Sequence, residues 1–162
     1  MIKKNSGFTL IEMLLYTGLL SIFLLILTQV FTSSLDAQLE SQATSSAEQD
    51  ARFIFARFAY DIENADSLVL PASPGESSPT LTLTRSGQTF SYSLQNNNLV
   101  LTDSTGPNVL NSYASNVTNL NFVRLGNVNG KNNIQVSYTI ESKTARVGGI
   151  ETRSFEATLG TR

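Results

Sequence analysis

Two residue types with special chemistry are missing from this chain of 162 residues, which contains no cysteine and no histidine. Without cysteine there is no disulfide, no zinc–thiolate site and no thiol nucleophile, so the fold depends on its core and its hydrogen bonds. Without histidine, a Ser-His-Asp triad, a histidine metal cluster and the commonest general base are excluded. We therefore expect a structural protein rather than an enzyme, with no cofactor and no bound metal.

Clustered positive charge is also missing. The formal net charge is -2 at pH 7, and the basic residues beyond Lys3 and Lys4 are scattered along the chain. A dedicated nucleic-acid surface would need such side chains gathered in a run or on one face. The composition therefore indicates no nucleic-acid partner.

Charge of either sign is absent between Met13 and Leu35, where most residues are leucine, isoleucine, phenylalanine or valine. The segment is longer than the roughly 20 residues that a helix needs to cross a bilayer, so it predicts a membrane span. Lys3 and Lys4 precede it, and the next basic residue is Arg52. The positive-inside rule therefore places the N-terminal end in the cytoplasm and the C-terminal part outside.

One carboxylate, that of Glu12, stands at the head of this apolar segment. In the simplest interpretation Glu12 has a local structural role and forms a capping box with Thr9, in which the two residues satisfy free N–H groups at the start of a helix. An ionisable group beside a membrane helix is costly, however, and usually has a partner. That partner is either one of the two leading lysines or an amine on Phe8, freed by cleavage after Gly7. The amine could belong to the same chain or to a neighbouring copy.

The order of these residues is specific: a short basic leader, Gly7, Phe8, three uncharged residues, Glu12 and then the apolar run. The pattern resembles the class III signal of type IV prepilins and of the pseudopilins of type II secretion. That resemblance implies cleavage after Gly7, N-methylation of Phe8 and an assembly salt bridge made by Glu12. The partners it implies are a prepilin peptidase/methyltransferase, other major and minor pilins or pseudopilins, the inner-membrane assembly platform, and the lipid bilayer before assembly.

An ordinary secretion signal is the alternative, since Thr32-Ser33-Ser34 offers small residues at a possible cleavage point. The apolar core of such a signal normally spans about 7 to 15 residues, and this segment is longer and carries Glu12 at its head. Ordinary cleavage would discard the helix, whereas cleavage after Gly7 keeps it. We favour the second outcome, in which the helix anchors or polymerises.

The helix is predicted to continue beyond the span, because no proline or glycine interrupts the sequence from Asp36 onward until Pro71. We expect it to end near Ala65, and the alternative is a break at Thr44-Ser45-Ser46. Apolar residues at intervals of three or four form one stripe. They are Leu35, Leu39, Ala43, Ala47, Ala51, Ile54, Phe58, Ile62 and Ala65.

Residue size along this stripe suggests two kinds of packing. We expect the alanines to pack loosely or against a partner, and the larger Ile54, Phe58 and Ile62 to dock firmly on a globular domain. The polar residues between them are expected to face water. These are Gln42, Glu48, Gln49 and Asp50.

Alternating apolar and polar residues predict strands in the C-terminal part. Thr80–Arg85, Phe90–Leu94 and Leu99–Thr102 read as a meander, and Val117–Leu125, Ile134–Ser142 and Thr152–Leu159 as longer strands. The asparagine-rich segment 127–133 is predicted to be a turn rather than a calcium site, because it lacks carboxylates. Six or seven strands after one helix predict an α+β fold in which the helix covers a sheet.

The predicted organisation is a prepilin leader at 1–7, a transmembrane and polymerisation helix at 8–35, an amphipathic helix at 36–66, and a β-rich extracytoplasmic domain at 67–162. By the resemblance, the protein resides in the bacterial inner membrane as a single-pass protein and then in a pilus or pseudopilus. Many major pilins close a loop with a disulfide, which this chain cannot form.

A second, local pattern lies in residues 49–66, where Arg52, Arg57, Asp61-Ile62 and Ala65 lead into the β-rich part. This pattern resembles the J-type minor pseudopilins and the W-type minor pilins, and it implies a low-abundance subunit that primes or caps a filament. Arg57 and Asp61 also read as an ordinary exposed i,i+4 ion pair. A major pilin, or a singly anchored binding protein that never polymerises, remains the alternative.

Overall fold

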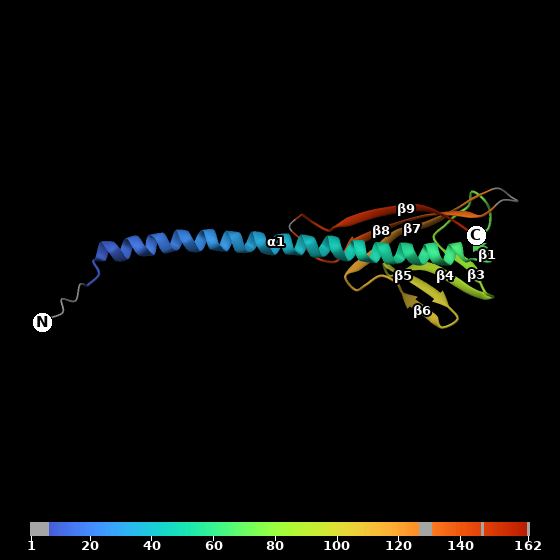
Figure 1. The fold of residues 1–162 in the computed structure, drawn as a ribbon, viewed down its shortest axis with the longest axis horizontal. Coiled ribbons are helices and arrows are strands. Elements are labelled where there is room, and N and C mark those ends of the chain that lie inside the picture. The colour runs from blue at the N-terminus through green and yellow to red at the C-terminus, as the bar shows by residue number, and fades with distance from the viewer. Residues whose placement is uncertain (1–6, 127–130, 147, 162) are drawn as a thin grey trace. The chain divides into compact units, whose positions relative to one another are not determined.

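A computed structural model describes residues 7–126, 131–146 and 148–161 (Figure 1). These ranges contain one helix, α1 (Leu10–Glu63), and nine strands. The chain divides into two compact units, the first ending at Gln38 and the second beginning at Leu39. The fold is therefore α+β, as the sequence predicts.

Helix α1 starts because Thr9 caps it: the backbone N–H of Glu12 donates to Thr9 Oγ1 at 3.3 Å. The predicted alternative, a break at Thr44-Ser45-Ser46, is wrong, since all three residues are helical. The Ser46 hydroxyl bonds the carbonyl of Ala43 at 3.1 Å and does not compete for the helix backbone N–H groups. The helix ends at Glu63, two residues before the predicted end.

The nine strands form two antiparallel sheets. The five-stranded sheet has the order β1-β3-β4-β5-β6, and the four-stranded sheet has the order β2-β7-β8-β9. The strand bounds are β1 Ser67–Leu70, β2 Ser77–Ser78, β3 Leu81–Arg85, β4 Gln88–Gln95, β5 Asn98–Asp103, β6 Gly106–Val109, β7 Ser115–Leu125, β8 Asn133–Ser142 and β9 Thr152–Gly160. The predicted meander is confirmed as β3, β4 and β5, and the three longer strands as β7, β8 and β9.

Two tight hairpins fix the register of the meander. The turn between β3 and β4 consists of Ser86 and Gly87, with φ of 51° and 75°, and the turn between β4 and β5 consists of Asn96 and Asn97, with φ of 49° and 61°. Two-residue hairpins favour positive φ at both positions, which glycine adopts freely and asparagine tolerates. The N–H of Val117 donates to Asn97 O at 2.8 Å and so joins the second hairpin to the other sheet.

The prediction of one covered sheet needs correction, because in the second unit α1 lies against both sheets (Figure 1). The ring of Phe58 meets Tyr92 of β4 with centroids 4.9 Å apart, Phe122 of β7 at 5.4 Å and Tyr138 of β8 at 5.9 Å. Aromatic pairs at such separations add to the stability gained from burial alone. Phe58 is therefore a central residue of the core.

The larger stripe residues are buried as predicted, with Ile54 and Ile62 at 0% exposure and Phe58 at 1%. The prediction of loose alanine packing is wrong, since Ala43 and Ala47 are 0% exposed and Ala51 is 1% exposed. The small side chains let the helix backbone come close to its surroundings within the second unit. The domain itself thus covers this part of the stripe.

Three short strands, β1, β2 and β6, were not predicted from the sequence. All three lie at the edges of their sheets. An edge strand pairs on one side only, and much of β1 and β6 is exposed, so neither shows a buried alternating pattern. Of the predicted turn at 127–133, residues 127–130 lie outside the described residues.

Asp50 does not simply face water as predicted. Its Oδ2 accepts hydrogen bonds from the N–H of Ser112 at 3.0 Å, the hydroxyl of Ser112 at 2.8 Å and the hydroxyl of Ser115 at 2.5 Å. Gln42 and Gln49 are exposed, and Glu48 pairs with Arg52 at 2.8 Å. Asp50 therefore fastens the segment between β6 and β7 to α1.

The interpretation of Arg57 and Asp61 as an exposed pair is also wrong. The two side chains do pair, with Nε to Oδ2 at 2.8 Å, but Asp61 is 0% exposed. Its carboxylate also accepts hydrogen bonds from Arg85 of β3 and from the hydroxyl of Tyr92 of β4. Asp61 is thus a buried link between α1 and the five-stranded sheet.

Candidate functional site

The predicted processing residues lie at the N-terminal side of α1. Gly7, Phe8 and Thr9 precede the first helical residue, and all three are exposed. The Phe8 side chain is 71% exposed. Exposed segments outside regular structure are the usual sites of proteolytic cleavage. The peptide bond between Gly7 and Phe8 is therefore accessible in this chain.

Only half of the predicted capping box around Glu12 is formed. Its backbone N–H bonds the Thr9 hydroxyl, but among the hydrogen bonds of residues 7–126 there is none from the Thr9 N–H back to the Glu12 carboxylate. Instead, Glu12 Oε1 accepts a hydrogen bond from the hydroxyl of Tyr16 at 3.4 Å. The predicted lysine partners, Lys3 and Lys4, lie outside the described residues. The Glu12 carboxylate thus has a neutral donor in this structure.

Tyr16 was not identified from the sequence. Its ring lies edge-on to that of Phe8, with centroids 6.1 Å apart and planes at 75°. The signal that could have revealed Tyr16 is its spacing of four residues from Glu12, because side chains at i and i+4 meet on one face of a helix. The structure therefore brings Phe8, which precedes α1, together with Glu12 and Tyr16 of its first turns.

The apolar residues of the first unit that the structure describes are uncovered. Every residue from 7 to 38 is exposed except Glu12, which is half-buried. Soluble monomers rarely expose continuous apolar surface of this extent, so the segment needs a cover of lipid or of other helices. By length and composition α1 can cross a membrane, with a mean hydropathy of 2.3 over its most apolar 18-residue window.

The hydroxyl groups in this apolar stretch are satisfied within the helix. Thr17 bonds the carbonyl of Met13 at 3.0 Å, Ser21 that of Thr17 at 2.8 Å and Thr28 that of Leu24 at 2.8 Å. Thr32 and Ser33 both bond the carbonyl of Gln29. Such bonds suit a bilayer, where water is not available to satisfy polar groups. Glu12 differs, because its charge has no cation within reach among residues 7–35.

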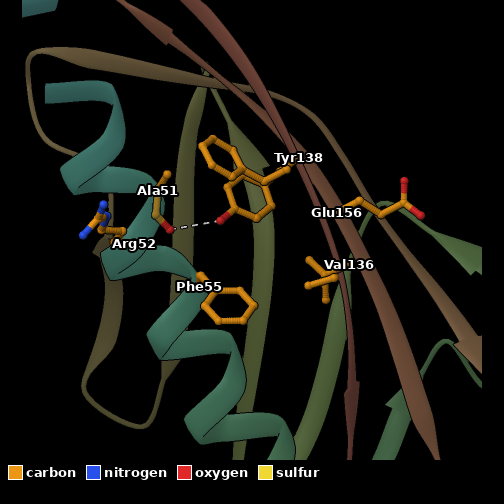
Figure 2. A pocket seen from close by; sticks show the side chains of 8 residues that line it. Ala51, Arg52, Phe55, Val136, Tyr138 and Glu156 are labelled. Carbon is orange, nitrogen blue, oxygen red and sulfur yellow. Dashed lines mark hydrogen bonds between the residues drawn. The ribbon is translucent and has the colours of Figure 1, made fainter. Parts of the chain in front are cut away.

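A second candidate site is a cavity of about 300 Å³ in the second unit, between α1 and strands β8 and β9 (Figure 2). Figure 2 shows Phe55 pointing from α1 toward Val136, and the Tyr138 hydroxyl bonding the carbonyl of Ala51 at 3.0 Å. Burial raises the pKa of Tyr138 to about 12, so this hydroxyl is a donor and not a base at neutral pH. The cavity is therefore suited to apolar contacts and not to catalysis by Tyr138.

Comparison with known proteins bears on the first site. A family model described as the prokaryotic N-terminal methylation motif matches residues 2–28. No curated protein and no solved structure matches the chain. The matched segment contains Gly7, Phe8, Glu12 and Tyr16.

The motif implies processing by a prepilin peptidase and assembly with other pilins, and it is a motif of structural subunits rather than enzymes. Together with the apolar helix, it is consistent with anchoring in the inner membrane. The methylation motif therefore supports a type IV pilin-like precursor.

Proposed function

We propose that the chain is a minor pilin or pseudopilin, a structural subunit of a type IV filament that is cleaved after Gly7 and N-methylated at Phe8. One observation carries the proposal: a single carboxylate, Glu12, heads an exposed apolar helix within the residues that match the methylation motif. A plain membrane anchor has no need of this residue, since a charged group near the bilayer is costly.

Assembly then depends on pairing of Glu12 with the amine of Phe8 on a neighbouring subunit. Inside a bundle of apolar helices an unpaired carboxylate would cost several kcal/mol of desolvation, and the amine offsets this cost. The two groups are four residues apart, which is about 6 Å along a helix at 1.5 Å per residue. Pairing between chains therefore also sets the axial offset of one subunit against the next.

The four predicted parts then have distinct tasks. The leader at 1–7 remains on the cytoplasmic side until cleavage, and the helix at 8–35 holds the subunit in the bilayer before assembly. The amphipathic helix at 36–66 and the β-rich part at 67–162 form the extracytoplasmic domain. The inner-membrane assembly platform moves the subunit from the bilayer into the pilus or pseudopilus.

A minor role, as in the J-type pseudopilins and the W-type pilins, is supported by the pattern of residues 49–66. In this segment Asp61 is buried and accepts hydrogen bonds from Arg85 of β3 and Tyr92 of β4. The pattern therefore contains a residue that holds α1 against the sheet in this domain. The absence of cysteine sets the chain apart from major pilins with a disulfide loop. We infer a subunit that primes or caps the filament, and a major pilin is the alternative.

Mass spectrometry of the mature N-terminus in the native host tests the proposal. N-methylated Phe8 is the expected result. An N-terminus at Leu35 would indicate ordinary secretion, and an intact Met1 would indicate an unprocessed anchor. Either of these outcomes would contradict the proposal. A methylated chain that is absent from purified filaments would instead indicate an anchored binding protein that does not polymerise.

A further inference from the structure

Tyr16 contacts both residues of the proposed assembly site. Its hydroxyl donates to Glu12 Oε1 at 3.4 Å, and its ring meets the ring of Phe8 edge-on at 6.1 Å. The hydroxyls of Thr17, Ser21 and Thr28, in contrast, bond carbonyls of the helix backbone. Tyr16 is therefore distinguished from these neighbours, because its hydroxyl engages a functional side chain.

We propose that Tyr16 is a positioning residue: it holds the Glu12 carboxylate while the subunit is unassembled and releases it to the amine of a neighbouring subunit. This inference rests on the proposed function. Tyr16 then acts in assembly as well as in contact with lipid.

An unassembled subunit needs such a partner for Glu12. The backbone N–H of Glu12 is already bonded to the Thr9 hydroxyl, so capping employs the backbone and leaves the carboxylate free. In a bilayer a carboxylate without any donor would lose its hydration without compensation. The Tyr16 hydroxyl provides one donor and keeps the carboxylate on a defined face of the helix.

The hydrogen bond between Tyr16 and Glu12 can be replaced by a bond from the amine of a neighbouring subunit. A distance of 3.4 Å lies beyond the usual 2.5 to 3.0 Å range of hydroxyl donors, so the bond is weak. An ammonium group forms a charge-assisted bond that is about twice as strong as a neutral one. Tyr16 is 51% exposed, so a neighbouring chain can approach its hydroxyl from the open side of the helix. The amine can therefore displace the hydroxyl at assembly.

The first test compares Tyr16→Phe with the wild-type chain in the native host. Phenylalanine keeps the ring that contacts Phe8 and removes only the hydroxyl. We expect normal cleavage and methylation by mass spectrometry, and incorporation into sheared filaments that is about 3- to 10-fold lower, because the Glu12 side chain is no longer held in place and has to be immobilised when the subunit assembles. Unchanged incorporation would overturn the inference, and so would failure of cleavage, which would place the hydroxyl in recognition by the peptidase.

A double-mutant cycle distinguishes positioning from packing. If Tyr16 acts through Glu12, then Tyr16→Phe reduces incorporation in the wild-type background but not further in a Glu12→Gln background. A role in helix packing alone would give the same fractional loss in both backgrounds, and that result would contradict the inference.

A hydroxyl placed at another position of the helix tests whether filament incorporation can be restored, and a second position serves as the matched control. In a Tyr16→Phe chain, Leu15→Tyr places a hydroxyl three residues from Glu12 on nearly the same face, whereas Leu14→Tyr places it two residues away on another face. We expect recovery of incorporation with Leu15→Tyr only. Equal recovery in both variants would mean that position is unimportant. Absence of the wild-type chain from filaments would contradict the proposed function itself, which is a different outcome from any of these.

Discussion

The carboxylate of Asp61 in α1 accepts a hydrogen bond from the hydroxyl of Tyr92 in β4, and neither residue has any exposed surface. Arg57 and Arg85 also form ion pairs with this carboxylate. Arg85 also lies over the rings of Tyr60 and Phe90, at 4.9 and 4.5 Å from their centroids, which helps to balance its charge. The C-terminal end of α1 is thereby bound to the five-stranded sheet by charge as well as by apolar packing.

Asp61→Ala is expected to lower the free energy of unfolding by about 3 kcal/mol, because it leaves two partly buried arginines and a tyrosine hydroxyl without their acceptor. Chemical denaturation of the full chain in a mild detergent, followed by circular dichroism, measures the change. Glu48→Ala is the matched control, since Glu48 pairs with Arg52 at the same i,i+4 spacing on the exposed side of α1. Equal effects of the two substitutions would contradict a special role for Asp61.

Unfolding should become easier at alkaline pH because of two buried tyrosines. Burial raises the pKa of Tyr138 from 10.0 to about 12, and burial together with the bond to Asp61 raises the pKa of Tyr92. The unfolded chain therefore releases these protons first as the pH rises, so the free energy of unfolding falls from about pH 10 upward and continues to fall through the raised pKa values.

Tyr138→Phe tests this pH dependence. The variant loses the bond to the Ala51 carbonyl and should be less stable at neutral pH by about 1 kcal/mol. Its free energy of unfolding should then fall less steeply than that of the wild type between pH 10 and 12. Tyr113→Phe is the control, because Tyr113 is 93% exposed, and it should leave the curve unchanged. A wild-type slope retained by Tyr138→Phe would exclude this residue as the source.

The cavity between α1 and strands β8 and β9 should accept a larger side chain from one of the residues that line it. Ala157 of β9 lines this cavity, and Ala157→Leu is expected to raise the free energy of unfolding by about 1 kcal/mol, as cavity-filling substitutions commonly do. Thr158→Leu is the control, since neighbouring residues of a strand point to opposite faces and Thr158 is exposed. Thermal unfolding of both variants measures the difference, and a loss of stability in Ala157→Leu would show that the cavity cannot accept a larger side chain.

The parts of the fold that could be predicted are those governed by local pattern. Helix α1 follows from apolar spacing without an interrupting proline, and β3, β4 and β5 follow from alternation between turn residues. The buried state of Asp61 could not be predicted in this way, because its partners Arg85 and Tyr92 lie 24 and 31 residues away in the sequence. Tyr16 was missed for a different reason: a tyrosine in an apolar run reads as an ordinary lipid contact until its hydroxyl is placed.

Glu12→Gln offers the most direct test of the assembly mechanism, because it removes the charge and keeps the size of the side chain. We expect the variant to be cleaved and N-methylated, since Gly7 and Phe8 are unchanged, but its incorporation into filaments should fall by about tenfold or more, because a buried ammonium of Phe8 would lack its counter-ion. Quantitative immunoblotting of sheared filaments against membrane fractions measures incorporation. Asp36→Asn is the matched control, since it removes one negative charge from an exposed position of the same helix outside the uncharged run. Normal incorporation of Glu12→Gln would rule out charge pairing, and an equal loss in Asp36→Asn would mean that only the total charge of the helix is important.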